Sequence, residues 1–144
     1  MTPWIQEAGV QDISKLIPVL KVLRPHLSDH DLFQLVPLLF EEGYRLIYMG
    51  DEENAYSAAG FRTMNFLFSG KTLYIDDLVT LPEHHKKGYA SSLLNWLKTY
   101  AMENQYDHFS LDSGFQRKDA HRLYLSSGLE MEGFHIGKKL SSWK

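Results

Sequence analysis

Three β-rich segments follow one another closely, and this arrangement limits the fold more than any other feature of the sequence. The segments cover residues 44–49, 56–68 and 71–81. Polar turns separate them at residues 51–54 and at Ser69 and Gly70. Short turns of this kind join strands that run in opposite directions, so the sequence predicts an antiparallel meander.

The segments on either side of the meander alternate between helix and strand patterns. A long amphipathic helix is predicted from Ala90, because apolar residues recur there with helical spacing as far as Ala101. Ser28 and Asp31 form a capping box before a shorter helix. The remaining expected elements are a first strand at 4–8, a helix at 11–23 shortened or kinked by Pro18, a strand at 108–112, a helix around 120–124 closed by Gly128, and a final strand at 129–140. We expect one α+β domain over residues 1–144, with a mostly antiparallel sheet of about six strands flanked by about four helices.

Composition excludes several classes of protein. A net charge of −3 and a pI near 6.1 argue against a general nucleic-acid binder, which usually carries a basic face. The chain has no cysteine, and therefore no disulfide, thiolate nucleophile or cysteine-ligated metal. His84 and His85 are adjacent and belong to no metal-binding motif, so we expect no metal site. No signal peptide or membrane-spanning run is visible, so we expect a cytoplasmic protein that does not bind membranes.

Residues 74–90 combine a strand, a short basic turn and the start of the long helix. Backbone N–H groups at a helix N-terminus, close to Lys86 and Lys87, suit a phosphate group. Two carboxylates, Asp76 and Asp77, lie just upstream. In a regular strand they point to opposite faces, whereas a local bulge would change which of them faces the site.

The segment from Asp76 to Ala90 resembles the acyl-CoA-binding segment of the GNAT superfamily of N-acetyltransferases. That family's pattern is Gln or Arg, two residues, Gly, one residue, then Gly or Ala; His85, Gly88 and Ala90 stand at these positions. His85 departs from the pattern. Residues 120–129, with Tyr124 and Gly128, resemble the family's closing helix, and the order of elements also matches.

The resemblance implies a binding site for acetyl-CoA. Amides of Leu78, Val79 and Thr80 would face the pantetheine arm and the thioester carbonyl, and amides from His85 to Ala90 would hold the pyrophosphate. Asp112 is expected to contact the pantetheine arm. The full set of expected cofactor-binding residues is Leu78, Val79, Thr80, His85, Lys86, Lys87, Gly88, Tyr89, Ala90, Ser91 and Asp112.

The resemblance also implies the chemistry. Tyr124 matches the general acid that protonates the leaving thiolate, and Asp76 matches an acidic residue that accepts the amine proton, with Asp77 in reserve. The expected reaction moves an acetyl group from acetyl-CoA to a primary amine of a small molecule or peptide, by direct attack in a ternary complex. The alternative is a non-catalytic acyl-CoA sensor with the same fold. The resemblance also allows a homodimer.

Overall fold

The computed structural model describes residues 4–114 and 116–143 of the chain. It divides into two compact units, Met1–Leu111 and Asp112–Lys144, and each is described by itself. The elements of the first unit are β1 (Trp4–Glu7), α1 (Ile13–Leu23), α2 (Asp29–Glu41), β2 (Arg45–Gly50), β3 (Ala55–Phe66), β4 (Gly70–Thr80), α3 (Tyr89–Glu103) and β5 (His108–Leu111). Within the described residues, no helix combines the length and the apolar character needed to cross a bilayer.

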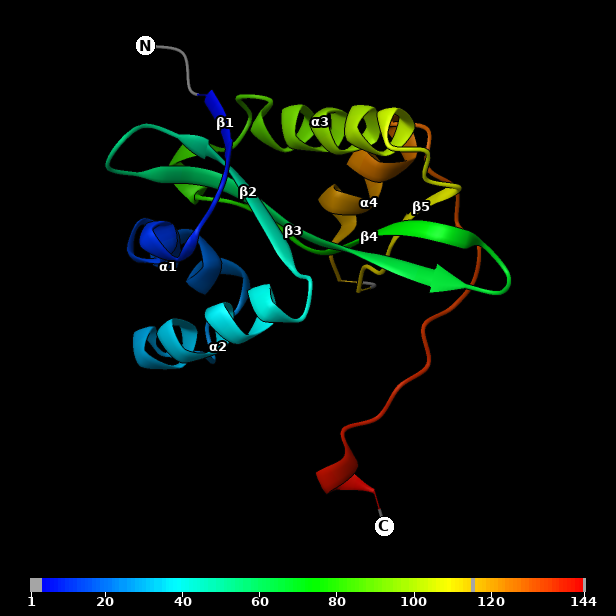
Figure 1. The fold of residues 1–144 in the computed structure, drawn as a ribbon, viewed down its shortest axis with the longest axis horizontal. Helices are drawn as coiled ribbons and strands as arrows, with labels where there is room; N and C mark the ends of the chain where they lie inside the picture. Colours follow the sequence, from blue (N-terminus) through cyan, green and yellow to red (C-terminus); the bar gives the residue numbers. More distant parts are fainter. Residues whose placement is uncertain (1–3, 115, 144) are drawn as a thin grey trace. The chain divides into compact units, whose positions relative to one another are not determined.

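The sheet of the first unit has the order β1-β2-β3-β4-β5 (Figure 1). Strands β1 to β4 pair antiparallel, and β5 pairs parallel with β4. This arrangement confirms the predicted meander and the α+β class. The sheet has five strands where about six were expected.

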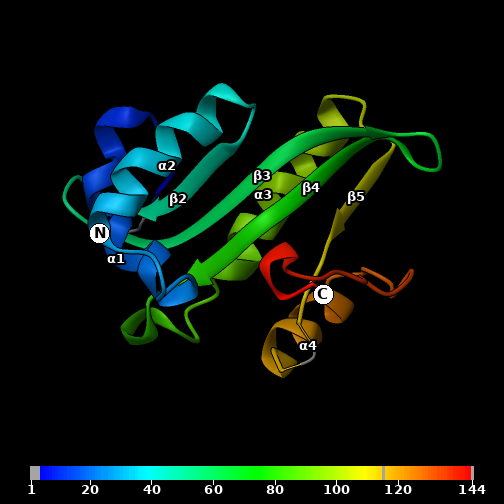
Figure 2. The ribbon, with the colours of Figure 1, turned by 90° about the horizontal axis from the view of Figure 1, so that it is seen from below.

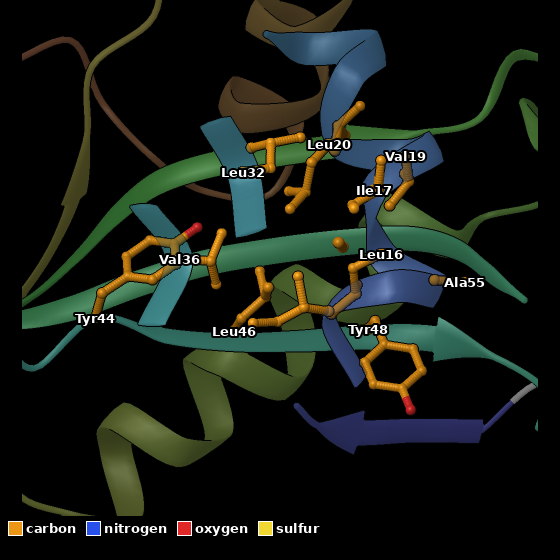
Figure 3. Close-up of a cluster of buried hydrophobic side chains, with 13 residues drawn as sticks. Leu16, Ile17, Val19, Leu20, Leu32, Val36, Tyr44, Leu46, Tyr48 and Ala55 are labelled. Atoms are coloured by element: carbon orange, nitrogen blue, oxygen red, sulfur yellow. The ribbon is translucent and has the colours of Figure 1, made fainter. Parts of the chain in front are cut away.

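Helices cover both faces of this sheet. Figures 1 and 2 show α1 and α2 on one face and α3 on the other. The apolar side chains of α1 and α2 pack on β2, β3 and β4 in a cluster that contains the fully buried Leu16, Val19 and Leu46 (Figure 3). Burial of each such side chain stabilises the fold by about 1.5–3 kcal/mol. Leu93 and Leu97 of α3 are equally buried, so each face of the sheet has a core of its own.

The first two helices show how far local signals determine their ends. Helix α2 begins at the predicted capping box: the Ser28 hydroxyl accepts from the Asp31 amide at 3.0 Å, and the Ser28 amide donates to the Asp31 carboxylate at 2.9 Å. Helix α1 runs from Ile13 to Leu23 with Pro18 inside it. Pro18 therefore does not end this helix, and the alternative, a kink at Pro18, stays a prediction. The packing of buried residues on both sides of the proline outweighs its missing hydrogen bond.

The second unit contains α4 (Lys118–Ser126) and a short 3-10 turn, η3 (Leu140–Ser142). Gly128 ends the helical region with a left-handed φ of 94°, and the Leu129 amide donates to the Tyr124 carbonyl at 3.1 Å, as the predicted glycine cap requires. The predicted strand at 129–140 is wrong, because residues 129–139 form no regular element. Its apolar residues suit a strand, but a strand also needs a partner for its backbone groups, and here Phe134 and Ile136 are exposed.

Candidate active site

A β-bulge in β4 determines where the two adjacent carboxylates lie. Gly60 of β3 pairs with Asp77, and the next residue, Phe61, pairs with Ile75, so Asp76 is the extra residue. A bulge of this kind changes the alternation of side chains along the strand. Asp76 and Asp77 therefore both point to the face covered by α1 and α2. The regular-strand expectation, in which Asp77 faces away from Asp76, is wrong for this reason.

Asp77 is held by two side chains from distant parts of the chain. The Tyr44 hydroxyl donates to one carboxylate oxygen at 2.7 Å. The Nη2 and Nε atoms of Arg24, at the C-terminal end of α1, donate to the other at 2.7 and 3.2 Å. Tyr44 is only 4% exposed and its hydroxyl lies against Gly60, at a place where any larger residue would collide with it. The position of the Asp77 carboxylate thus depends on a glycine in the neighbouring strand.

Asp76 has a separate partner. Nε of Arg62 lies 3.0 Å and Nη2 lies 2.6 Å from one carboxylate oxygen of Asp76. Burial raises the pKa of the Asp76 carboxyl, and the Arg62 guanidinium opposes that rise. The Arg62 guanidinium also lies over the Tyr44 ring, 5.5 Å from its centre. The residues around the bulge therefore form one connected group, which we call the carboxylate cluster: Arg24, Tyr44, Arg62, Asp76 and Asp77.

The carboxylate cluster is partly open to solvent. The side chains of Asp77 and Asp76 are 17% and 22% exposed, whereas Arg24 is 45% exposed. Sequence reasoning missed both arginines. A charged residue in the middle of a long β-rich segment was the available signal for Arg62. No local pattern indicates Arg24, which is 53 positions from its partner.

The turn before α3 presents free backbone donors. Lys86 and Gly88 adopt left-handed conformations, with φ of 63° and 79°. Gly88 is the N-cap residue of α3, and within the described part of the chain no side-chain hydrogen bond caps this helix. Among the described residues, the amides from Lys86 to Ser91 have no hydrogen-bond acceptor. Successive free amides at a helix N-terminus attract anions, so this turn fits the phosphates of a coenzyme A group.

The side chains of this turn are engaged with the protein itself. His85 Nε2 lies 3.0 Å from the Thr80 carbonyl oxygen. The Lys87 ammonium lies 3.3 Å from Nδ1 of His84, whose ring stacks on Tyr56 with centres 4.1 Å apart. The turn therefore offers its backbone to an anion more directly than the side chains of His85 and Lys87.

The end of β4 runs beyond its neighbour on one side. β5 pairs with β4 only from Thr72 to Ile75, so the segment from Asp76 to Thr80 continues past the end of β5. On its other side this segment pairs with β3, where Ser57 bonds Thr80 through their hydroxyl groups at 2.7 Å. Leu78, Val79 and Thr80 thus link the carboxylate cluster to the turn before α3. Their contacts with a pantetheine arm stay a prediction.

Tyr124 and Asp112 belong to the second unit. Tyr124 lies on α4 and is 8% exposed, and burial raises the pKa of its phenol while Arg117 opposes the rise. The Asp112 carboxylate lies 3.6 Å from the His135 ring. Asp76 and Asp77 lie in the first unit, as does the turn before α3. The catalytic roles of Asp76, Asp77 and Tyr124, and the cofactor contact of Asp112, stay predictions.

Comparison with known proteins identifies the family. The sequence model of the acetyltransferase (GNAT) family matches residues 14–129 of the chain. The chain therefore belongs to the GNAT family, which confirms the resemblance found in its sequence.

Individual relatives agree with this assignment. The uncharacterized N-acetyltransferase YhdJ of Bacillus subtilis (strain 168) is 31% identical over 135 residues, which cover 92% of this chain and 95% of that protein. An aminoalkylphosphonate N-acetyltransferase of Salmonella typhimurium is 33% identical over 66 residues, 46% of this chain and 43% of the relative. The solved structure of the aminoglycoside N-acetyltransferase AAC(6')-Iy in complex with CoA shares the fold, with a TM-score of 0.83 and 11% identity over 95% of this chain and 93% of the other.

Proposed function

We propose that this protein transfers an acetyl group from acetyl-CoA to a primary amine of a small molecule or peptide. One observation carries the proposal. The turn before α3, with its free amides, follows β4, and β4 carries the two largely buried carboxylates of Asp76 and Asp77. Such a turn suits a phosphorylated donor, and carboxylates suit an ammonium that must lose a proton. Membership of the GNAT family supports the same reaction. The two acetyltransferases named for their substrates take different acceptors, so they do not select one for this chain.

The proposed binding of the donor uses the turn and the end of β4. The amides from Lys86 to Ser91 would face the pyrophosphate, with Lys86 adding positive charge, and the positive end of the α3 dipole would favour the phosphate charge. The His85 amide, expected to join them, donates instead to the Pro82 carbonyl at 3.2 Å. Leu78, Val79 and Thr80 would line the pantetheine arm, together with Asp112. When bound, acetyl-CoA supplies a thioester carbonyl that an amine can attack.

The proposed proton transfers involve three side chains. Asp76 would accept the proton of the acceptor ammonium, because the raised pKa of its carboxyl makes it a stronger base than an exposed aspartate. Asp77, held by Tyr44 and Arg24, is the reserve base and would otherwise orient the acceptor. Tyr124 would donate its phenolic proton to the leaving sulfur, and a phenol is well matched in acidity to a thiol. Direct attack in a ternary complex needs no acyl-enzyme, and the chain has no cysteine to form one.

Three further features are part of this proposal. Residues 1–144 would act as one domain, since the match to the family spans parts of both units. The protein would work in the cytoplasm. It would be a monomer or a homodimer.

A second candidate is a non-catalytic acyl-CoA sensor. The observation that favours it is His85, which replaces the Gln or Arg of the family pattern and contacts the Thr80 carbonyl. A sensor would bind acetyl-CoA without releasing thiol.

Two measurements test the proposal. Acetyl-CoA at about 100 times its dissociation constant should stabilise the native protein by about 2.7 kcal/mol, visible as a higher melting temperature. Release of free CoA thiol, followed across a panel of primary amines, then separates an enzyme from a sensor. A melting temperature that acetyl-CoA leaves unchanged would refute the donor, and stabilisation without thiol release for any amine would favour the sensor.

A further inference from the structure

The charges of the carboxylate cluster are already balanced within it. Asp76 pairs with Arg62, and Asp77 pairs with Arg24. The two carboxylates are therefore compensated by two guanidinium groups in a half-buried setting. The exposed Glu42 adds one further negative charge that acts on Arg62 from a distance. A site for a polycation would instead need several carboxylates without such partners.

Arg24 and Arg62 both have N–H groups that make no bond to the aspartates. A guanidinium has five N–H groups, and the bonds to the aspartates use only the Nε and Nη2 atoms of each arginine. Among residues 4–114 and 116–143, the Nη1 groups of Arg24 and Arg62 donate no hydrogen bond. Arg24 is the more exposed of the two, and its place at the end of α1 is held by the bond from its own amide to the Leu20 carbonyl, at 2.9 Å. Its Nη1 group is thus a ready anchor for an anionic oxygen.

We propose that the acceptor is a zwitterionic amine, in which an ammonium group and a carboxylate or phosphonate group are carried by one small molecule. This inference rests on the proposed function and names the acceptor class for the same site. The ammonium lies against Asp76, and the anionic group takes the free donors of Arg24. A simple monocation has no group that can accept from the free donors of Arg24, whereas a zwitterion forms a charge-assisted hydrogen bond with them.

The test compares amines that differ in the anionic group. The full chain with saturating acetyl-CoA is assayed by thiol release against β-alanine, aminoethylphosphonate, propylamine and spermidine. We expect kcat/KM for at least one of the two zwitterions to exceed that for propylamine and for spermidine by about tenfold or more. A preference for β-alanine would indicate a carboxylate acceptor, and a preference for aminoethylphosphonate would indicate a phosphonate. A preference for propylamine or spermidine would overturn the proposal.

Variants identify the residue responsible. Arg24→Gln should raise KM for the preferred zwitterion by about tenfold or more relative to KM for propylamine, because only the zwitterion carries an anionic group that the Arg24 donors can bind. Lys21→Gln is the matched control: it removes one positive charge from the same helix, where Lys21 pairs with Asp29, and should leave the ratio of the two KM values unchanged. An equal change for both amines in Arg24→Gln would also overturn the proposal.

The assays separate a failure of the zwitterionic acceptor from a failure of the acetyltransferase function on which it rests. Turnover of amines without preference for an anionic group refutes the zwitterionic acceptor and leaves the acetyltransferase intact. Failure to acetylate any amine refutes both. Should Arg24→Gln unfold, Arg24→Lys serves in its place: a single ammonium keeps the charge but cannot bond Asp77 and the acceptor in the same way, so KM for the zwitterion should still rise.

Discussion

Replacing Gly60 with alanine should destabilise the protein, although the same change usually favours a strand. A Cβ at this position would lie 1.7 Å from the Tyr44 hydroxyl oxygen and 2.3 Å from the adjoining ring carbon. Tyr44 is 4% exposed, stacks on Phe40 and lies below Arg62, so its ring has little room to move. The ring must shift, and the bond from its hydroxyl to Asp77 must break.

The magnitude follows from three contributions. Overpacking a filled site costs about 1–3 kcal/mol. Loss of a hydrogen bond to a charged group costs about 1.5–3 kcal/mol. Replacing glycine by alanine within a strand, without a collision, stabilises the folded state by about 0.5–1 kcal/mol. The net loss expected for Gly60→Ala is therefore about 1.5–5.5 kcal/mol.

Denaturant unfolding of four proteins measures this loss: wild type, Gly60→Ala, Tyr44→Ala and the double variant. Because the collision needs the Tyr44 ring, Gly60→Ala should cost far less in the Tyr44→Ala background. Gly133→Ala is the control, since no atom lies within 4 Å of a Cβ there, and it should change stability by less than about 0.5 kcal/mol. The same cost for Gly60→Ala with and without the tyrosine would refute the reasoning.

Three further changes test other parts of the molecule. Tyr124→Phe should lower kcat by roughly ten- to a thousandfold in the thiol-release assay, and an unchanged kcat would remove Tyr124 from its role as general acid. Gly88→Ala forces a side chain into the left-handed region, at a cost of about 1–2 kcal/mol, and should weaken acetyl-CoA binding in calorimetry as the amides turn away; equal affinity would argue against the turn as the phosphate site. Glu7→Gln tests the ion pair with Arg45, whose hydrogen bond lowers the pKa of the Glu7 carboxyl from its ordinary 4.5. The stability that Glu7 contributes is complete above pH 4.5 and disappears as the pH falls through the lowered pKa, so the unfolding free energies of wild type and variant should differ at neutral pH and converge in acid.

Local signals in the sequence were sufficient for most of the first unit. The turn at Ser69 and Gly70, the Ser28 capping box and the apolar stripe of α3 each involve residues close in the chain. The same holds for the turn before α3, where Gly88 indicates a left-handed residue before a helix. Elements of this kind are predictable because their causes lie within a few positions of each other.

The carboxylate cluster depends on contacts that no local pattern contains. Asp77 meets Tyr44 from 33 positions away and Arg24 from 53 positions away. The bulge depends on how β4 pairs with β3, so the sequence of β4 alone permitted two orientations of Asp77. The wrong prediction of a strand at 129–140 has a similar cause, because the residues of one segment carry no information about whether a partner strand is present.

The bulge at Asp76 also limits how the chain can change in length. Before it, Ile75 shares a side of the sheet with Phe61, which touches Tyr100 of α3; after it, Val79 packs in the core beneath α1 and α2. Deletion of Asp76 would reverse the side-chain directions at the end of β4, so that Asp77 and Val79 would face α3. Substitutions at Asp76 can therefore be tolerated by the fold where its deletion cannot. Within this family, a gap or insertion in β4 should mark a protein in which other residues take the places that Asp76 and Asp77 have here.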